Sequence, residues 1–229
     1  MDLETIKNES IHVIVKNIIE INSWRYTELA IIRKLANEFK DDEDLREMDK
    51  FILRSFIPMI YAHWEGFCVN AFKEVQKYLK GLKLKPLETN INLVVRCFDQ
   101  KFNYLKSKQS FDQRKEFTES FHELYFSNYL TFDTKVDTKS NLRFEVLKDL
   151  CTQFDFKFDN FSSIESELEK LVNIRNSIAH GENGYILVRK NIFSFLQTVE
   201  DAFDILVLEI NDYLINEKFR AEGLSISLG

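Results

Sequence analysis

Residues 162–181, SSIESELEKLVNIRNSIAHG, contain the pattern that decides the fold of this chain. Ser162 and Glu165 have the spacing of a capping box, in which each side chain satisfies one free backbone N–H group at a helix start. Gly181 suits the first position after a helix, where a left-handed backbone is common. Between them, apolar side chains recur at helical spacing at Ile164, Leu168, Leu171, Val172, Ile178 and Ala179. The stretch therefore predicts one amphipathic helix that begins at Ser162.

The rest of the chain predicts further helices. Its 229 residues include only six glycines and two prolines, whereas hairpins and sandwiches need frequent turn residues. Helical patterns are expected over residues 3–39, 45–79, 89–106, 111–129, 141–154 and 187–218, with a break in the first near Asn22 and Ser23. The prediction is an all-α, antiparallel helical bundle forming a single domain over residues 1–229. Residues 80–140 are expected as a helical insertion and residues 219–229 as a frayed tail.

Composition limits the range of functions. The formal net charge of −6 disfavours a broad, non-specific grip on nucleic acid, but leaves room for a small basic site. Three unevenly spaced cysteines without a CxxC pair are typical of buried thiols in a reducing compartment. No secretory leader opens the chain, so we expect a cytoplasmic protein. The most apolar window, residues 51–72, contains Arg54, His63 and Glu65, which indicates a core helix and no membrane span.

Arg175, Asn176 and His180 are the best candidates for chemistry. On an ideal helix, Arg175 falls about 20° from Ile164 and hence within the apolar stripe. A guanidinium cannot lose its proton, so a buried one needs an anionic or multidentate polar partner. Glu65, in the apolar second helix, is the predicted partner, although a core glutamate that is satisfied by another helix is an equal alternative.

Asn176 and His180 fall at about 120° and 160° on the same helix, away from Arg175. Three arrangements would bring Arg175 and His180 together. The helix ends near Ala179 and frees His180, or the arginine side chain reaches round, or two copies of the motif meet across a dimer. A histidine at a helix C-terminus suits general acid–base work. The alternative is structural, with His180 as a capping residue and Arg175 as a buried ion.

Other chemical motifs are absent from the sequence. It contains no HExxH motif and no paired cysteines for zinc, and neither of the glycine-rich loops that bind nucleotide phosphates. The GxSxG turn of serine hydrolases is missing as well. We therefore expect no metal and no cofactor.

The motif at residues 175–181, RNSIAHG, resembles the Rx4H signature of the HEPN superfamily. Two further stretches are similar to segments of the MAE-like HEPN branch. Residues 61–67, YAHWEGF, resemble its second-helix signature, and residues 140–147, SNLRFEVL, resemble the segment before its Rx4H helix. The order and spacing of the three stretches carry the resemblance across most of the chain.

The resemblance implies a helical bundle that pairs as a homodimer. It also implies a metal-independent endoribonuclease acting as a toxin or an anti-phage defence effector, with an antitoxin or a sensor protein as a partner. By position, Arg175 would hold the scissile phosphate and His180 would act as general acid or base. Asn176 would orient the phosphate or the imidazole, with Ser177 and Glu65 in supporting places. The ribose 2′-OH would attack, leaving a 2′,3′-cyclic phosphate, so the substrate would be RNA. Other HEPN domains bind or assemble without catalysis, and this second function stays open.

Overall fold

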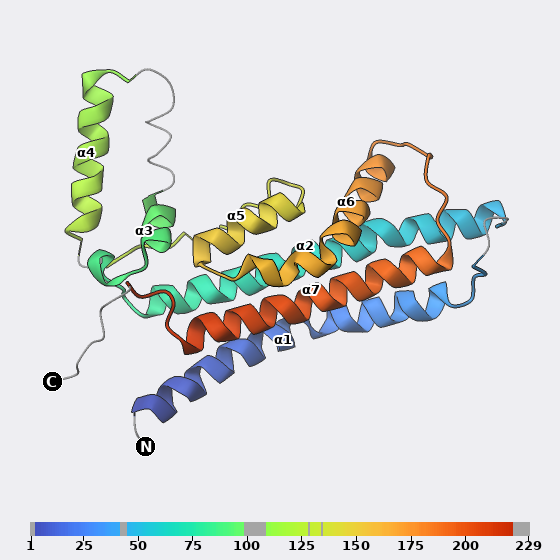
Figure 1. Ribbon diagram of the computed structural model, residues 1–229, viewed down its shortest axis with the longest axis horizontal. Coiled ribbons are helices and arrows are strands. Elements are labelled where there is room, and N and C mark those ends of the chain that lie inside the picture. Colours follow the sequence, from blue (N-terminus) through green and yellow to red (C-terminus); the bar gives the residue numbers. More distant parts are fainter. Residues whose placement is uncertain (1–2, 42–44, 99–108, 128, 134, 222–229) are drawn as a thin grey trace.

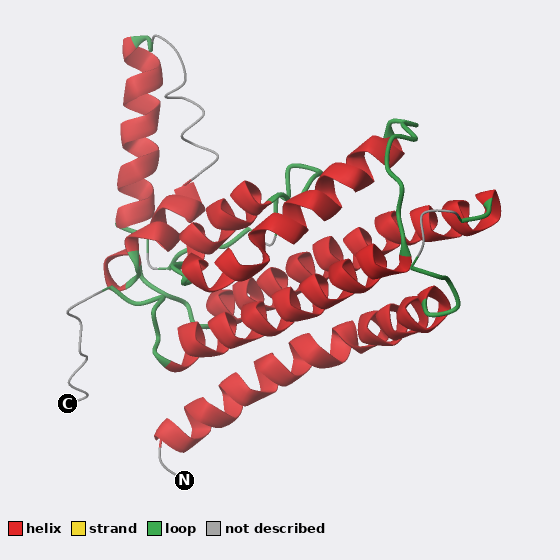
Figure 2. Ribbon diagram, turned by 45° about the vertical axis from the view of Figure 1, so that its right-hand side comes forward, coloured by secondary structure: helices red, strands yellow, loops and turns green. Residues whose placement is uncertain are grey.

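The computed structural model describes residues 3–41, 45–98, 109–127, 129–133 and 135–221, and for residues 3–10 the backbone alone. These residues form helices and loops and no β-strand; an isolated antiparallel bridge joins Thr89 to Arg220 (Figure 2). The prediction of an all-α fold is confirmed. The α-helices are α1 (Leu3–Ala36), α2 (Glu47–Gly81), α3 (Ile91–Phe98), α4 (Phe111–Tyr125), α5 (Phe144–Phe154), α6 (Glu165–Ala179) and α7 (Arg189–Ile215), with short 3-10 helices over Pro86–Glu88 and Phe158–Ile164.

Three long helices, α1, α2 and α7, run side by side and form the body of the bundle, and α5 and α6 lie across one side of it (Figure 1). Large aromatic side chains fill the space between the long helices. Phe67 on α2 stacks on Phe203 on α7 with 3.9 Å between ring centroids, and Tyr26 on α1 meets Phe203 edge-on. Burying several such rings provides much of the stabilisation of a bundle this size.

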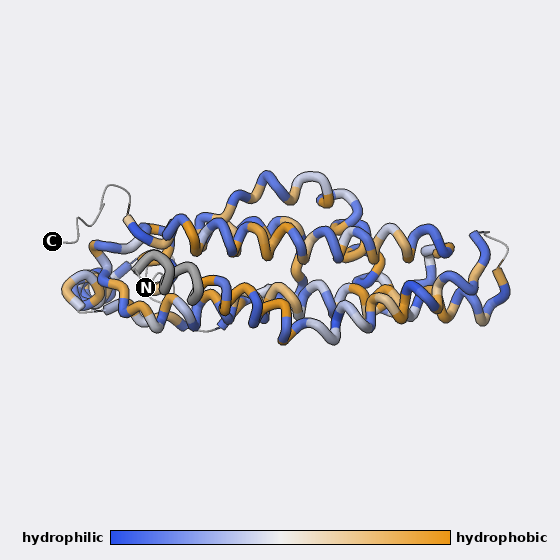
Figure 3. The backbone as a smooth tube through the Cα atoms, turned by 90° about the horizontal axis from the view of Figure 1, so that it is seen from below, coloured by the Kyte–Doolittle hydropathy of each residue, from blue (hydrophilic) through white to orange (hydrophobic). Residues whose placement is uncertain are grey.

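Hydrophobic and hydrophilic residues alternate along each long helix (Figure 3). This is the pattern of helices that bury one face and expose the other. No helix in the described residues combines the length and the apolar character that crossing a membrane requires. Cys68 and Cys151 are buried and Cys97 is half-buried, all three as free thiols. Burial raises the pKa of Cys97 and of Cys151 to about 12, so neither is a reactive thiolate at neutral pH.

Two local predictions are wrong. The first helix does not break near Asn22, because the buried Asn22 amide donates to the carbonyl of Ile18 at 2.8 Å and stays within a continuous α1. The capping box does not form either: α6 begins at Glu165, after a 3-10 turn, and its N-cap residue, Ile164, provides no side-chain hydrogen bond.

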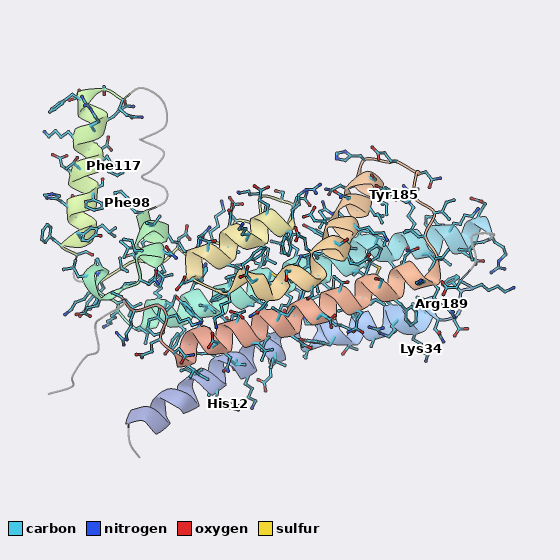
Figure 4. All side chains as sticks on the ribbon, in the orientation of Figure 1. His12, Lys34, Phe98, Phe117, Tyr185 and Arg189 are labelled. Atoms are coloured by element: carbon cyan, nitrogen blue, oxygen red, sulfur yellow. The ribbon has the colours of Figure 1, made fainter. Side chains whose placement is uncertain are left out.

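Of the segment 80–140, helices α3 and α4 lie at one end of the bundle, where α4 projects beside α3 (Figure 1). Phe98 on α3 meets Phe117 on α4 edge-on at 5.2 Å between ring centroids (Figure 4). That this segment is an insertion in a single domain stays a prediction, and residues 99–106 of the predicted 89–106 helix lie outside the described residues. The tail predicted at 219–229 begins in an ordered state, since Phe219 is fully buried; residues 222–229 are outside the described residues.

Candidate functional site

The motif helix, α6, ends directly before His180. The last helical residue of α6 is Ala179, and Gly181 has a φ of +80°, in the left-handed region that favours glycine. The N–H of Gly181 donates to the carbonyl of Ile178 at 3.0 Å, and the N–H of Glu182 donates to the carbonyl of Ser177 at 2.9 Å. These two bonds make a Schellman motif, which satisfies the free carbonyl groups at the helix end. The helix therefore ends near Ala179, as the first of the three arrangements requires, with Gly181 directly after the cap residue.

His180 is exposed at this helix end. Its backbone N–H donates to the carbonyl of Asn176, but within the described residues its imidazole has no hydrogen bond, ion pair or ring contact. The structural alternative gave His180 a capping role. The backbone of Gly181 and Glu182 caps the helix here, so the imidazole is left available to solvent or to a ligand.

Arg175 lies over an aromatic ring of α2. Its guanidinium carbon is 4.4 Å from the ring centroid of Tyr61, and Nη1 donates to Oδ1 of Asn176 at 2.9 Å. The stack on the ring face is a cation–π contact, which fixes the plane of the guanidinium without neutralising its charge. Arg175 is half-buried, so the sequence prediction of a side chain within the apolar stripe is met in part.

Tyr61 is the support on which Arg175 lies. Its ring is 1% exposed, and its hydroxyl oxygen accepts the backbone N–H of Leu142 at 2.7 Å. Burial raises the pKa of Tyr61 to about 12; the Leu142 N–H opposes this, the carboxylate of Glu65 adds to it, and the charge of Arg175 opposes it. Tyr61 is therefore a neutral phenol at physiological pH, held in place by burial and by the hydrogen bond from Leu142.

The predicted ion pair between Arg175 and Glu65 does not form. Among the described residues, no carboxylate lies within 4.0 Å of the Arg175 guanidinium. Glu65 is half-buried one turn beyond Tyr61 on α2 and acts on the Tyr61 hydroxyl. The aromatic ring takes the place on α2 that the sequence interpretation gave to the carboxylate, because residues four apart on a helix occupy neighbouring positions on one face.

The three stretches that carry the family resemblance meet around Tyr61. Tyr61 belongs to the first, Leu142 to the second and Arg175 to the third. The second stretch is also tied to α6 directly. Arg143 donates through Nη1 to Glu169 and to Asn173 at 2.9 Å each, and the Phe144 N–H donates to Glu169 at 2.7 Å. The segment before α5 thus holds α2 and α6 in the register that stacks Arg175 on Tyr61.

The loop after the motif is held by Arg54 on α2. Its guanidinium donates to the carbonyl of Glu182 and to the side-chain oxygen of Asn183. This brings a second cation to the residues that follow His180. The chain then folds back so that Tyr185 lies beside α6 (Figure 4), where it closes one end of a groove of about 550 Å³ that continues along α6 past Asn173 to Glu165.

Two residues of this site have no predicted role. In the sequence, Arg54 is one of the charged residues of the apolar window 51–72, and Tyr61 is part of the YAHWEGF stretch. Their spacing does contain a signal: Arg54, Tyr61 and Glu65 are seven and four residues apart, so they lie on one face of α2. Which helix this face meets is decided by the tertiary fold.

No group of three His, Cys, Asp or Glu side chains within the described ranges is arranged to hold a metal ion. The site consists of an exposed imidazole, a stacked guanidinium bonded to an amide, and a second guanidinium, that of Arg54 on α2, which binds the loop. Such a set can bind a phosphate and transfer a proton.

Comparison with known proteins agrees with the fold. The chain matches the RiboL-PSP-HEPN family over residues 20–216, and therefore belongs to that family and to the HEPN superfamily. The match confirms the superfamily and names RiboL-PSP-HEPN as the branch, whereas the sequence motifs resembled the MAE-like branch. No curated protein and no solved structure matches the chain.

Proposed function

We propose that this protein is a metal-independent endoribonuclease, with Arg175, Asn176 and His180 as its catalytic residues. One observation carries the proposal: the Arg175 guanidinium is fixed by Tyr61 and Asn176, yet it has no carboxylate partner among the described residues. A positioned cation of this kind can stabilise negative charge that develops on a phosphate.

In the proposed reaction, the ribose 2′-oxygen attacks the adjacent phosphorus and the bond to the 5′-oxygen breaks. Arg175 binds the non-bridging oxygens, and Asn176 keeps the guanidinium oriented. His180 takes the proton from the 2′-OH or gives one to the leaving 5′-oxygen. The products are a 2′,3′-cyclic phosphate and a 5′-OH, so DNA, which lacks the 2′-OH, is not cut. Ser177 and Glu65 support the site through the helix end and through Tyr61.

The test is cleavage of total RNA by purified protein in EDTA, beside His180→Ala. We expect cutting by the wild type and a loss of about 100-fold or more in the variant. His12→Ala is the matched control, because His12 is also exposed but lies on α1, far from α6 (Figure 4). No cutting by the wild type, or equal cutting by wild type and His180→Ala, would contradict the proposal.

A homodimer forms part of this proposal. α6 is regular through Ala179, so Arg175 and His180 of one chain leave the helix in different directions. Two motifs that meet across a dimer would supply an arginine from one chain and a histidine from the other. Mixing inactive Arg175→Ala with inactive His180→Ala should then restore part of the activity. A mixture that stays inactive, or a monomer in sedimentation at micromolar concentration, counts against a shared site.

The second candidate is a binding or assembly module without turnover, in which Arg175 is a structural ion. It predicts that Arg175→Ala destabilises the fold by about 3–5 kcal/mol, as loss of a buried ion partner does. The observed stack on Tyr61 predicts a cost nearer 1 kcal/mol. Thermal unfolding of Arg175→Ala beside the wild type separates the two.

The cellular role that we propose is that of a cytoplasmic toxin or anti-phage effector held in check by an antitoxin or a sensor protein. It follows from the family together with an activity that would damage the host's own RNA. Induced expression of the wild type should arrest growth, whereas His180→Ala should not. Equal growth of both strains would contradict this role.

A further inference from the structure

A second stacked arginine, Arg25 on α1, lies on the other flank of α2. We propose that the face formed by α1 and α2 binds one nucleotide of single-stranded RNA, with the base on Trp24 and the phosphate on Arg25. The inference rests on the proposed function in one respect, namely that RNA is the substrate. It describes a binding site outside the catalytic motif.

Arg25 is fixed by two contacts on α1. Its guanidinium carbon lies 4.4 Å from the ring centroid of Trp24, and its Nε donates to Oδ1 of Asn22 at 2.9 Å. Asn22 is fully buried and is itself held, since it donates to Ile18 and accepts from Nδ2 of Asn70 on α2 at 3.2 Å. A buried amide that is bonded to both helices is a rigid support for the arginine.

Gly66 on α2 provides the space in which this guanidinium lies. A Cβ atom at Gly66 would be 2.4 Å from Nη2 of Arg25, well inside van der Waals contact. The guanidinium therefore lies directly against the backbone of α2, over a residue that has no side chain. Glycine inside a helix lowers stability by up to about 1 kcal/mol relative to alanine. At Gly66 this loss accompanies the space that the Arg25 guanidinium occupies.

The charge of Arg25 is not matched. Within the part of the chain that the structure describes, neither of its Nη nitrogens has an acceptor. The carboxylate whose charge acts on Arg25, that of Glu28, is 3.1 Å from Nε2 of the buried His63. Burial lowers the pKa of Arg25, and the charge of Glu28 opposes this only in part. A half-buried guanidinium with spare donors is stabilised by an anion that accepts two parallel hydrogen bonds, and two oxygens of a phosphate can do so.

Trp24 supplies the second half of the ligand chemistry. Its side chain is 48% exposed although it lies beside Arg25 and meets the His63 ring edge-on. An exposed indole next to an arginine is the combination on which unpaired bases stack. Lys73 is exposed on the same face of α2, seven residues and about 10 Å beyond Gly66, where a neighbouring phosphate would lie. These three groups together fit an RNA strand better than they fit a single small anion.

His63 does not make this a second catalytic site. Its side chain is 5% exposed, Nε2 faces Glu28, and Nδ1 is buried without a partner among the described residues. Burial lowers its pKa, Glu28 opposes this and Arg25 adds to it, so the ring stays neutral near pH 7. A buried neutral ring cannot reach a ligand to exchange a proton with it. The face is suited to binding and not to cleavage.

The two tryptophans permit a direct test. Trp64 is fully buried, so a change in fluorescence on adding RNA reports Trp24. The titration uses a ten-nucleotide oligoadenylate RNA and the His180→Ala protein, which keeps the probe intact. We expect quenching that saturates, and a dissociation constant raised roughly ten-fold by Arg25→Lys, because lysine cannot form the planar fork. Arg33→Lys is the matched control: Arg33 is on the same helix, but it is paired with Glu200 on α7.

The absence of quenching, or equal affinity for Arg25→Lys and the control, would overturn the proposal. A third result would also overturn it: the wild type sediments as a dimer, Trp24→Ala sediments as a monomer, and Trp24 fluorescence does not respond to RNA. This face would then be a contact between copies of the chain. The two proposals fail separately. Quenching without cleavage would support the binding site and contradict the ribonuclease proposal. Cleavage without quenching would support the ribonuclease proposal and contradict the binding site.

Discussion

The two flanks of α2 contain the same construction. On one, Arg175 lies 4.4 Å from the ring of Tyr61 and donates to Asn176 at 2.9 Å; on the other, Arg25 lies 4.4 Å from the ring of Trp24 and donates to Asn22 at 2.9 Å. A histidine belongs to each: His180 directly follows the motif helix, and His63 meets the Trp24 ring edge-on. The guanidinium is therefore held in the same way on both flanks, so a difference in function between them must come from the groups around it.

Exposure is what differs. At the α6 flank the ring is buried and the histidine is exposed, whereas at the α1 flank the ring is exposed and the histidine is buried. An exposed imidazole can exchange protons, and an exposed indole can stack on a base. Under the two proposals, a stacked arginine alone does not define an active site. The neighbouring group that solvent or substrate can reach would decide between chemistry and binding.

Conservative replacement of the two arginines should give the sharpest contrast and the largest effect. Arg175→Lys should lower kcat by about 100-fold, because a point charge does not reproduce the oriented fork. Arg25→Lys should raise KM and leave kcat near its wild-type value, as loss of uniform binding does. Steady-state kinetics on one RNA substrate measures both. A fall in kcat of equal size for both variants would mean that the flanks do not have different roles.

Removing the Tyr61 hydroxyl tests the support under Arg175. Tyr61→Phe leaves the N–H of Leu142 without its acceptor, and we expect a loss of about 1–3 kcal/mol in the free energy of unfolding. The ring and its stack remain, so cleavage should fall far less than in Arg175→Lys. Denaturant unfolding and the cleavage assay are run on the same preparation. A stable variant that has lost all activity would show that the hydroxyl acts in the reaction itself.

Filling the space at Gly66 tests the other flank. Gly66→Ala should displace the flexible end of Arg25 while the helix gains up to about 1 kcal/mol, so the melting temperature should change little. Quenching of Trp24 by oligoadenylate should weaken. Gly81→Ala is the control, because nothing lies within 4 Å of a Cβ atom there. Unchanged RNA affinity in Gly66→Ala would show that the position of Arg25 does not matter for RNA binding.

The buried histidine should produce the smallest effect, seen only in the pH dependence of stability. Burial lowers the pKa of His63 below 6.5, so between the two values the unfolded chain takes up a proton that the folded chain does not. The stability that His63 contributes is therefore complete above about pH 6.5 and declines as the pH falls below it. The melting temperature of His63→Leu should fall less than that of the wild type when the pH is lowered from about 7.5 to 5.5. A wild type and a variant with parallel profiles would exclude His63 as the cause.

The all-helical fold follows from local information. Few glycines and prolines and a regular apolar spacing indicate helices wherever they occur, and Gly181 marks the end of the motif helix from its position alone. The start of α6 is different. Ser162 and Glu165 have the right spacing for a capping box, but packing of the Phe158–Ile164 turn takes precedence, and Ser162 becomes part of a 3-10 helix.

By itself, the sequence determined the helices, the superfamily and the three residues Arg175, Asn176 and His180 as the place to look. Only the tertiary structure decided what Arg175 lies on, because Tyr61 and Glu65 share one face of α2 and the segment at Leu142 sets which of them meets α6. It alone placed Arg25, which is next to Trp24 in the sequence, against Gly66. The physical reason is that periodicity along a chain fixes which side of a helix is buried, whereas partners far apart in sequence are fixed by how helices pack against one another.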